Sequence, residues 1–455
     1  MDRAVVEPQT QENTDRLTLA RELTFRDGMS LVVGTVIGSG IFLVPGPIAH
    51  QLRPLSSVIL VWIIGGLLSL FGALSIGELA AIYPSTGGLY VYLRHVYGRP
   101  LAFLYGWSLF GVIQSGSIAT LAAGFALYLS QLTPISYFQQ KLVAITCILS
   151  LSVINCVGLS RAKLLQNIAS ICKVMGIGVL VASLFWRGHL SLLQTSMQLH
   201  QVATPSLLAF GTALTAVLWG YEGWHNVSFV AAEFRSPQRD LPKALMYGTL
   251  TCAFVYVIAN LAYYAVLTPD ALKASDHAAA TALLAAYGPR ATLLVSLLIL
   301  VSILGATNGN VLAGPRVYYA MAKDGLFASL FSNVSARFRT PVNSILLQGV
   351  WASLLTLTGT FQQLYTYVIF TAWMFYALTV AGTVVLRIRK PDLDRPFRAP
   401  AFPWIQIAFV LAALSIAFST IIDDPLHAAI GIGIVLTGIP LYLLARRSST
   451  STASN

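Results

Sequence analysis

The chain has 455 residues, of which 56% are hydrophobic and only 10% are charged. Its mean hydropathy is +0.73. Soluble domains contain about 25% charged residues, so this composition excludes an ordinary soluble domain. The net charge of +11 would suit a nucleic-acid partner, but it can also arise from the loops of a membrane protein.

Apolar runs recur along the chain, and each is long enough to cross a hydrocarbon core of about 30 Å. A polar stretch at 1–24 precedes them and is expected to be a cytoplasmic tail, and 447–455 is expected to be a disordered tail. The fold class predicted is an all-α integral membrane protein with twelve transmembrane helices. In chain order, the predicted helices cover residues 27–50, 55–83, 100–131, 138–158, 164–186, 205–233, 243–267, 291–321, 342–359, 362–387, 402–421 and 426–445.

Lysines and arginines are divided unequally between the two sets of loops that this topology creates. If the N-terminus is cytoplasmic, 22 of the 28 basic residues lie on the cytoplasmic face and 5 on the opposite face, with Lys173 left inside a helix. This asymmetry follows the positive-inside rule and requires no nucleic-acid partner. We expect a multi-pass protein of the plasma membrane, in contact with the lipid bilayer, with both termini in the cytoplasm.

Patterns typical of enzymes and ATP-driven pumps are absent from the sequence. No glycine-rich loop ends in Gly-Lys-Ser or Gly-Lys-Thr. The seven histidines are scattered, the four cysteines lack metal-ligand spacing, and most acidic residues lie in predicted loops. We therefore expect no enzymatic activity, no cofactor and no metal site.

The first predicted helix contains the segment LVVGTVIGSGIFLVPG, residues 31–46, with four glycines. Each glycine costs a helix about 0.5–1 kcal/mol relative to alanine. Gly34 and Gly38 fit a small-xxx-small pattern, which indicates close helix packing. The alternative is an unwound segment whose backbone groups face a ligand.

A second interruption lies in TAVLWGYEGWHNVSFV, residues 215–230, where polar residues and glycines crowd together. A charged residue, a histidine and an amide at this depth do not suit a lipid-facing helix. The two interruptions fall in the first and sixth predicted helices, as in transporters built from two inverted five-helix repeats. We expect a ten-helix transport core at 25–387, with repeats at about 25–186 and 205–387, followed by helices 11 and 12 at 388–446.

Four motifs in order give the chain a family resemblance: GTVIGSGIF, GYEGWHNVSFVAAEFRSPQRDLPKAL, SILGATNGNVLAGPRVYYAMAKDG (302–325) and RTPVNS (339–344). Together they resemble the amino acid–polyamine–organocation superfamily, and within it the L-type amino-acid transporters and their bacterial serine/threonine-exchanger relatives. The resemblance implies a leucine-transporter-like fold with broken helices 1 and 6. It also implies a zwitterionic amino-acid substrate.

The first break offers complementary groups for such a substrate. Free amides at Ser39 and Gly40 begin a half-helix and suit a carboxylate. Carbonyls of Thr35, Val36 and Ile37 end the preceding half-helix and suit an ammonium group.

Further contacts follow from the resemblance. The Trp219 carbonyl would complete the amine site and its ring would close over the substrate, although simple core packing is the alternative. Tyr221, Gly223 and Trp224 would shape the side-chain pocket. Third-helix residues at pocket-lining positions, which could equally make ordinary interhelical contacts, are Val112, Ile113, Gln114 and Ser117.

Glu222 and His225 depart from the most common family pattern. Many relatives have glycine at the position of Glu222, and others have aspartate. Glu222 could hold the break through a salt bridge, carry a proton or recognise a substrate amine. His225 is expected to be a hydrogen-bonded wall residue.

Lys173 lies ten residues beyond Lys163, which marks the cytoplasmic end of the fifth predicted helix. A rise of 1.5 Å per residue places it about 15 Å deep, where a charge needs a partner. A buried salt bridge is one explanation. The resemblance implies another, a fixed cation that replaces sodium by binding carbonyls near Gly34 and Ser302.

Two expectations concern the cytoplasmic face and the partners. Four charged residues at the ends of helices six and eight look like an inner gate, or alternatively a solvated face: Glu233, Arg235, Arg239 and Arg316. Animal members of the family join an accessory glycoprotein through a cysteine after the third helix. The corresponding loop here, SQLTPISYFQQK, has no cysteine, so we expect no disulfide-linked subunit.

The function predicted is a sodium-independent secondary amino-acid transporter that exchanges substrates by alternating access. A proton-coupled uptake permease is the alternative within the same class. A non-transporting amino-acid sensor on the same fold is the alternative from a different class. The sequence leaves open which amino acids are carried.

Overall fold

A computed structural model of the protein describes residues 19–130, 132–198, 205–423 and 425–451. The described residues are almost entirely helical, and their β-structure is one isolated bridge between Leu23 and Phe234. Most of the predicted N-terminal tail (1–18) and the last residues of the predicted C-terminal tail (452–455) lie outside the described residues.

The helices follow the predicted apolar runs, with short helices between several of them. The first part of the chain forms α2 (Phe25–Val36), α3 (Gly40–Leu43), α4 (Pro45–Gln51), α5 (Leu55–Ile82), α6 (Leu89–Tyr97), α7 (Arg99–Ser108), η1 (Leu109–Ile113), α8 (Gln114–Leu129), α9 (Tyr137–Cys156), α10 (Leu159–Arg187) and α11 (Leu190–Gln198). The second part forms α12 (Leu207–Gly220), η3 (Trp224–Glu233), α13 (Pro237–Tyr264), α14 (Pro269–Lys273), α15 (Ala278–Tyr287), α16 (Pro289–Ala313), α17 (Pro315–Lys323), η4 (Ser329–Ser332), α18 (Val342–Thr356), α19 (Phe361–Arg389), α20 (Trp404–Asp423) and α21 (Pro425–Ser451).

Ten helical segments among the described residues are long and apolar enough to cross a membrane. Every one of the twelve predicted ranges overlaps a helix, but two fall short of that length. The range 205–233 is divided between α12 and η3, and the range 342–359 holds only the 15-residue α18. The fold is therefore a helical membrane architecture with at least ten segments that can span the bilayer. At the C-terminus α21 continues to Ser451, into the tail expected to be disordered from 447.

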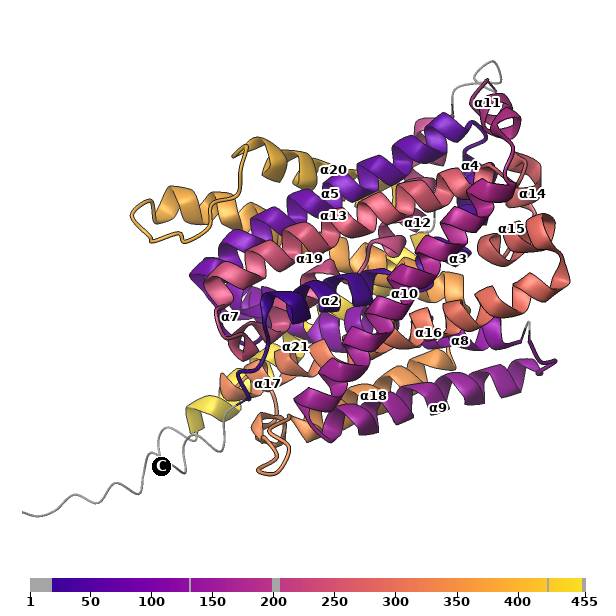
Figure 1. The fold of residues 1–455 in the computed structure, drawn as a ribbon. Helices are drawn as coiled ribbons and strands as arrows, with labels where there is room; N and C mark the ends of the chain where they lie inside the picture. Colours follow the sequence, from indigo (N-terminus) through magenta and orange to yellow (C-terminus); the bar gives the residue numbers. More distant parts are fainter. Residues whose placement is uncertain (1–18, 131, 199–204, 424, 452–455) are drawn as a thin grey trace, which may run out of the picture.

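The long helices lie roughly side by side, so the bundle has two ends (Figure 1). The helix pair α5 and α13 packs together along its length, as do α10 with α16 and α9 with α18. We call the end that carries α11, α14 and α15, at the right of Figure 1, the vestibule end. The opposite end carries the start of α7 and the connection between α19 and α20 (390–403), and we call it the basic end.

Both predicted interruptions are present in the backbone. The helix α2 ends at Val36, residues 37–39 are not helical, and α3 begins at Gly40. The helix α12 ends at Gly220, and a turn leads into the 3₁₀-helix η3. Gly223 in this turn has φ +105°, a left-handed conformation that glycine adopts without the steric cost of a Cβ atom.

Candidate functional site

The two helix breaks are in direct contact inside the bundle. A Cβ atom placed on Gly40 would lie 2.5 Å from the Cα atom of Gly220, so no larger residue fits without moving backbone. The Thr35 hydroxyl donates a hydrogen bond of 3.0 Å to the carbonyl of Gly223. The first glycine-rich segment therefore serves close packing of one break on the other, whatever ligand role it has.

Tyr256 on α13 joins the same two breaks, although nothing in the sequence singled it out. Its hydroxyl lies 2.8 Å from the carbonyl of Val36 and 2.8 Å from the carbonyl of Gly220. The side chain is completely buried. Because the hydroxyl has one proton, it donates to one carbonyl at a time, and either bond holds a broken helix end against α13.

Lys173 on α10 is completely buried and lies beside the first break. Its Nζ atom donates to the carbonyls of Gly34 (2.8 Å), Ile37 (2.7 Å) and Ser302 (2.9 Å). An ammonium group has three N–H donors, and all three are used. Among the described residues no carboxylate forms an ion pair with Lys173, so the salt-bridge explanation lacks its acidic partner.

A small polar cavity lies where the breaks meet, with a volume of about 10 Å³. This is about the space that one water molecule requires, so an amino acid needs the walls to separate. The lining residues come from α2, the first break, α8, α12, the second break and α16. They are Thr35, Val36, Gly38, Ser39, Gly40, Ser117, Leu121, Trp219, Glu222 and Asn310.

Apart from Gln114, which donates to Asn310, thirteen residues are expected to contact the substrate. Seven of them, Glu222 included, line this cavity, and six do not. The Ile37 carbonyl is bound by Lys173, and the Tyr221 hydroxyl donates to the carbonyl of Trp62, 3.0 Å away on α5. The Trp224 ring packs edge-on against that of Tyr376 on α19. The other three outside the cavity wall are Val112 and Ile113, which lie in the π-helix η1, and Gly223, whose carbonyl accepts from Thr35.

Glu222 belongs to a buried polar cluster that the sequence did not show in full. Its Oε1 atom accepts a hydrogen bond of 2.6 Å from the Tyr376 hydroxyl, which also lies 3.1 Å from Nε2 of His225. The Oε2 atom of Glu222 and Nδ1 of His225 are buried and have no hydrogen-bond partner among the described residues. Glu222 therefore brings an unused acceptor to the wall of the cavity.

Buried amides connect the helices around the cavity. The Asn310 side chain accepts from Gln114 on α8 (3.0 Å) and from Asn226 on η3 (3.1 Å). Asn308, two residues before Asn310 on α16, donates to Gln166 (2.9 Å) and accepts from Asn155 (2.9 Å). These bonds hold α16 against four neighbouring segments, namely α8, η3, α10 and α9. In the sequence, each of these amides is only an isolated polar residue.

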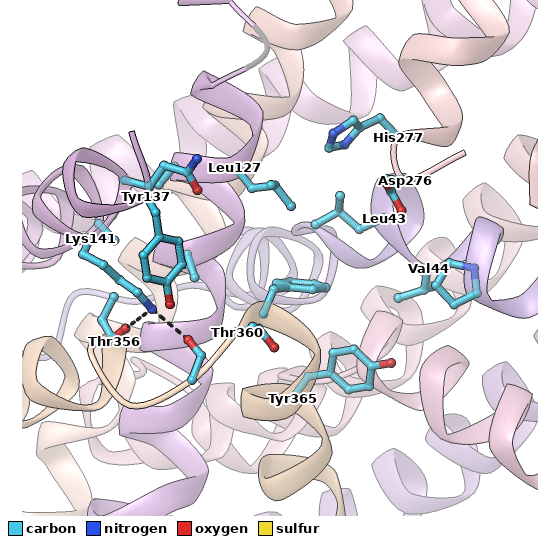
Figure 2. Close-up of a pocket in the computed structure, with 17 residues that line it drawn as sticks. Leu43, Val44, Leu127, Tyr137, Lys141, Asp276, His277, Thr356, Thr360 and Tyr365 are labelled. Carbon is cyan, nitrogen blue, oxygen red and sulfur yellow. Dashed lines mark hydrogen bonds between the residues drawn. The ribbon is translucent and has the colours of Figure 1, made fainter. Parts of the chain in front are cut away.

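A much larger cavity of about 590 Å³ opens at the vestibule end (Figure 2). Lys141 donates to the carbonyls of Thr356 (2.6 Å) and Gly359 (2.8 Å), which ties the start of α9 to the α18–α19 connection. Asp276 and His277 lie on the opposite wall. Burial lowers the pKa of His277, and the neighbouring Asp276 opposes part of that shift.

Trp219 separates the two cavities. Its ring stacks on Tyr365 with 5.8 Å between centroids and meets Phe361 edge-on at 6.2 Å. Phe361 and Tyr365 line the large cavity, whereas Trp219 lines the small one. An aromatic layer of Trp219, Phe361 and Tyr365 thus lies between the two cavities.

Ion pairs close the basic end. Arg316 forms a two-point pair with Glu233, at 2.8 and 3.1 Å, and both side chains are buried. The predicted four-residue gate is only partly assembled, since Arg235 and Arg239 are exposed and Arg239 lies 3.4 Å from Asp240 instead.

A second closure at the basic end was not predicted. Asp324 accepts from the Tyr90 hydroxyl (2.6 Å) and from Arg94, and its carbonyl accepts from Arg99. These residues join α6 and α7 to the end of α17. Their charges look like solvated loop residues in the sequence, because only the fold brings them together.

Comparison with known proteins gives one family for nearly the whole chain. A family described as "Amino acid permease" matches residues 23–444. The serine/threonine exchanger SteT of Bacillus subtilis is 30% identical over 442 residues, which cover 96% of this chain and 100% of the relative.

Two animal relatives are similarly distant. The b(0,+)-type amino acid transporter 1 of Mus musculus is 29% identical, covering 94% of this chain and 88% of the relative. The cystine/glutamate transporter of Homo sapiens is 28% identical, covering 96% of this chain and 87% of the relative. All three relatives are named as transporters or exchangers of amino acids.

Proposed function

Because this chain belongs to the amino acid permease family, we propose that it is a sodium-independent exchanger of zwitterionic amino acids. The relatives support an amino-acid substrate, although their names refer to different amino acids. The observation that carries the proposal is the meeting of two helix breaks around a small polar cavity lined by buried residues.

The substrate binds where the breaks meet. The amides at Ser39 and Gly40 receive its carboxylate, because the first N–H groups of a helix have no intrahelical partner. Its ammonium binds the carbonyls of Thr35 and Trp219. The neighbouring carbonyls support this choice, since the Ile37 carbonyl is held by Lys173 and the Val36 carbonyl accepts from the Gly38 amide and faces the Tyr256 hydroxyl. The Trp219 carbonyl accepts from the Glu222 amide (3.1 Å), and a carbonyl oxygen has a second lone pair for the ammonium group.

The aromatic layer around Trp219 and the ion pairs of the basic end would open in turn during alternating access. The substrate enters from the vestibule by displacing the Trp219 layer, and it leaves after the ion pairs Glu233–Arg316 and Asp324–Arg94 separate. The small cavity of about 10 Å³ corresponds to the substrate-free protein with its vestibule open.

Lys173 supports sodium independence. Its ammonium lies among three carbonyl oxygens, which are the ligands that a hard cation prefers. We propose that it replaces a coupling ion permanently. Its carbonyl partners connect α2 to α16, so it also holds the first break in place.

We also propose that the chain has twelve transmembrane helices, with α12–η3 and α18 as the two short crossings. Ten of them form the core 25–387, arranged as inverted repeats at about 25–186 and 205–387. Helices α20 and α21 lie outside the core. We also propose a plasma-membrane protein with a cytoplasmic basic end and cytoplasmic termini, working without a disulfide-linked subunit.

The test is transport by the purified protein in liposomes. Labelled serine, threonine, cystine, glutamate and arginine are offered in turn, with and without internal amino acid, sodium and a pH gradient. We expect internal amino acid to be the main stimulus and sodium to have no effect. Uptake driven by a pH gradient alone would favour the proton-coupled permease instead, with Glu222 as its carrier because of the free Oε2 atom. Specific binding without any transport would favour a sensor.

A further inference from the structure

A basic pocket lies outside the transport path, at the basic end of the bundle. It has a volume of about 150 Å³ and is lined by Arg387 from the end of α19 and by Pro391, Arg395 and Arg398 from the α19–α20 connection. A water molecule takes about 30 Å³ in the liquid, so the pocket has room for a tetrahedral oxyanion.

One carboxylate pairs with two of the three guanidinium groups of this pocket. Glu78 on α5 accepts from Arg387 at 2.9 and 2.5 Å and from the Ala399 amide at 2.8 Å, and its Oε1 atom lies 3.5 Å from Nε of Arg395. Three positive charges and one negative charge leave the pocket with two positive charges.

Arg395 is held rigidly in this wall. Its side chain is only 4% exposed, and its terminal nitrogens donate to four backbone carbonyls, of Leu386, Lys390, Pro391 and Leu393. Its Nε atom is buried without a hydrogen-bond partner among the described residues. Backbone carbonyls cancel no net charge, so the fold keeps a desolvated cation in the wall.

Arg398 is the flexible member of the pocket. It is exposed and forms no ion pair among the described residues. The acidic residues of the same connection, Asp392 and Asp394, are exposed and do not line the cavity. Among the described residues, Glu78 is therefore the carboxylate that pairs with arginines of this pocket.

We propose that this pocket binds a phosphate group. The exposed guanidinium group of Arg398 can bind two phosphate oxygens. Arg387 and Arg395, whose donors are mostly bonded to Glu78 and to backbone carbonyls, contribute positive charge to the wall. The group could belong to an anionic phospholipid or to free phosphate. The adjacent start of α20 presents Trp404, which is 72% exposed, and tryptophan is enriched at the membrane interface where phospholipid headgroups lie.

The experiment measures thermal unfolding of the purified full-length protein in detergent. Inorganic phosphate, phosphatidylglycerol or phosphatidylcholine is titrated at constant ionic strength, because a ligand that binds only the folded protein raises Tm. The variants are Arg398→Gln, Arg398→Lys and the control Arg389→Gln, which removes an exposed charge from the same helix end without touching the cavity.

We expect wild type and Arg389→Gln to be stabilised equally. The apparent affinity should fall about fivefold in Arg398→Gln, the effect of about one basic residue near a phosphate surface, and less in Arg398→Lys. Stabilisation by phosphatidylglycerol alone identifies a lipid site, and stabilisation by inorganic phosphate alone identifies a site for the free anion. Stabilisation by both shows that the pocket recognises the phosphate group itself. Equal responses of Arg398→Gln and Arg389→Gln, or no response to either phosphate source, would overturn the proposal.

Discussion

The two helix breaks differ in which of their polar groups are used. At the first break, Lys173 donates to three carbonyls, and the Val36 carbonyl accepts from the Gly38 amide and lies 2.8 Å from the Tyr256 hydroxyl, whereas the buried Ser39 hydroxyl has no hydrogen-bond partner among the described residues. At the second break, Oε2 of Glu222 and Nδ1 of His225 have no hydrogen-bond partner among the described residues, and Nδ1 of His225 lies 3.9 Å from Oε1 of Glu222.

We propose from this difference that the two breaks have different roles in substrate recognition. The carbonyls of the first break are held by Lys173 in one stable geometry, and its amides at Ser39 and Gly40, which have no intrahelical partner, are proposed to bind the carboxylate that all amino acids share. A break with unused polar groups at the cavity wall can respond to what differs between substrates, because a buried unpaired group gains when a ligand pairs with it. The first break would thus set the substrate class, and the second would select among its members.

The largest effect is expected from Lys173→Met, which keeps the length of the side chain and removes its charge. Three buried carbonyls lose their donor, at a cost of about 1–3 kcal/mol for each unsatisfied group, so exchange should fall by about 100-fold or more. Exchange is measured in liposomes and normalised to folded protein. Arg161→Gln, an exposed charge on the same helix, is the control. Normal exchange by Lys173→Met, or sodium-stimulated exchange by wild type, would contradict the proposal that Lys173 acts as a fixed cation at the first break.

The next effect concerns the substrate rather than the protein. Amino-acid amides lack the carboxylate that the first break is proposed to bind, and hydrogen bonds to a charged group contribute about 1.5–3 kcal/mol. We expect alaninamide to compete at least about tenfold more weakly than alanine for uptake of a labelled amino acid. Equal competition would show that the amides at Ser39 and Gly40 have a packing role only.

Tyr256→Phe removes the hydroxyl shared by the two breaks. One hydrogen bond of about 1 kcal/mol would be lost, so we expect about fivefold slower exchange with the substrate preference unchanged. Tyr263→Phe on the same helix is the matched control, because its equally buried hydroxyl makes only a long contact of 3.4 Å with Ile41. If both variants behave alike, the bridge between the breaks has no role in transport.

The smallest change in total rate is expected from Glu222→Gln. The glutamine amide keeps the shape of the side chain and one acceptor oxygen, but it replaces the other carboxylate oxygen with an NH2 donor. We therefore expect KM values to shift about threefold relative to one another between substrates, while kcat changes little. The measurement is a full KM and kcat series for neutral and cationic amino acids. Loss of all exchange, together with loss of any response to a pH gradient, would instead indicate a proton carrier.

The positions of the breaks could be predicted because glycine and polar residues are conspicuous in an apolar run. The depth of Lys173 followed from helical rise alone, and the resemblance supplied its expected partners. The packing of Gly40 on Gly220 was beyond the sequence, since it depends on how two distant segments cross. A bulky substitution at Gly40 would therefore disturb packing and ligand binding together.

Other residues of the site could not be predicted because their contacts also depend on tertiary structure. Tyr256 and Tyr376 are aromatic residues in apolar helices, where packing and hydrogen bonding give the same pattern. Arg94 and Asp324 are 230 positions apart, and their pairing follows from tertiary structure only. Arg235 was expected in the gate because of its place in sequence, yet its side chain turns outward.

The buried ammonium of Lys173 also bears on the electrical behaviour of the transport cycle. A coupling ion that is carried across contributes about 2.3 kcal/mol per charge for every 100 mV of membrane voltage. Lys173 is part of the chain and is delivered to neither side. A one-for-one exchange of zwitterions would then move no net charge, and the two amino-acid gradients alone would set the direction of flow.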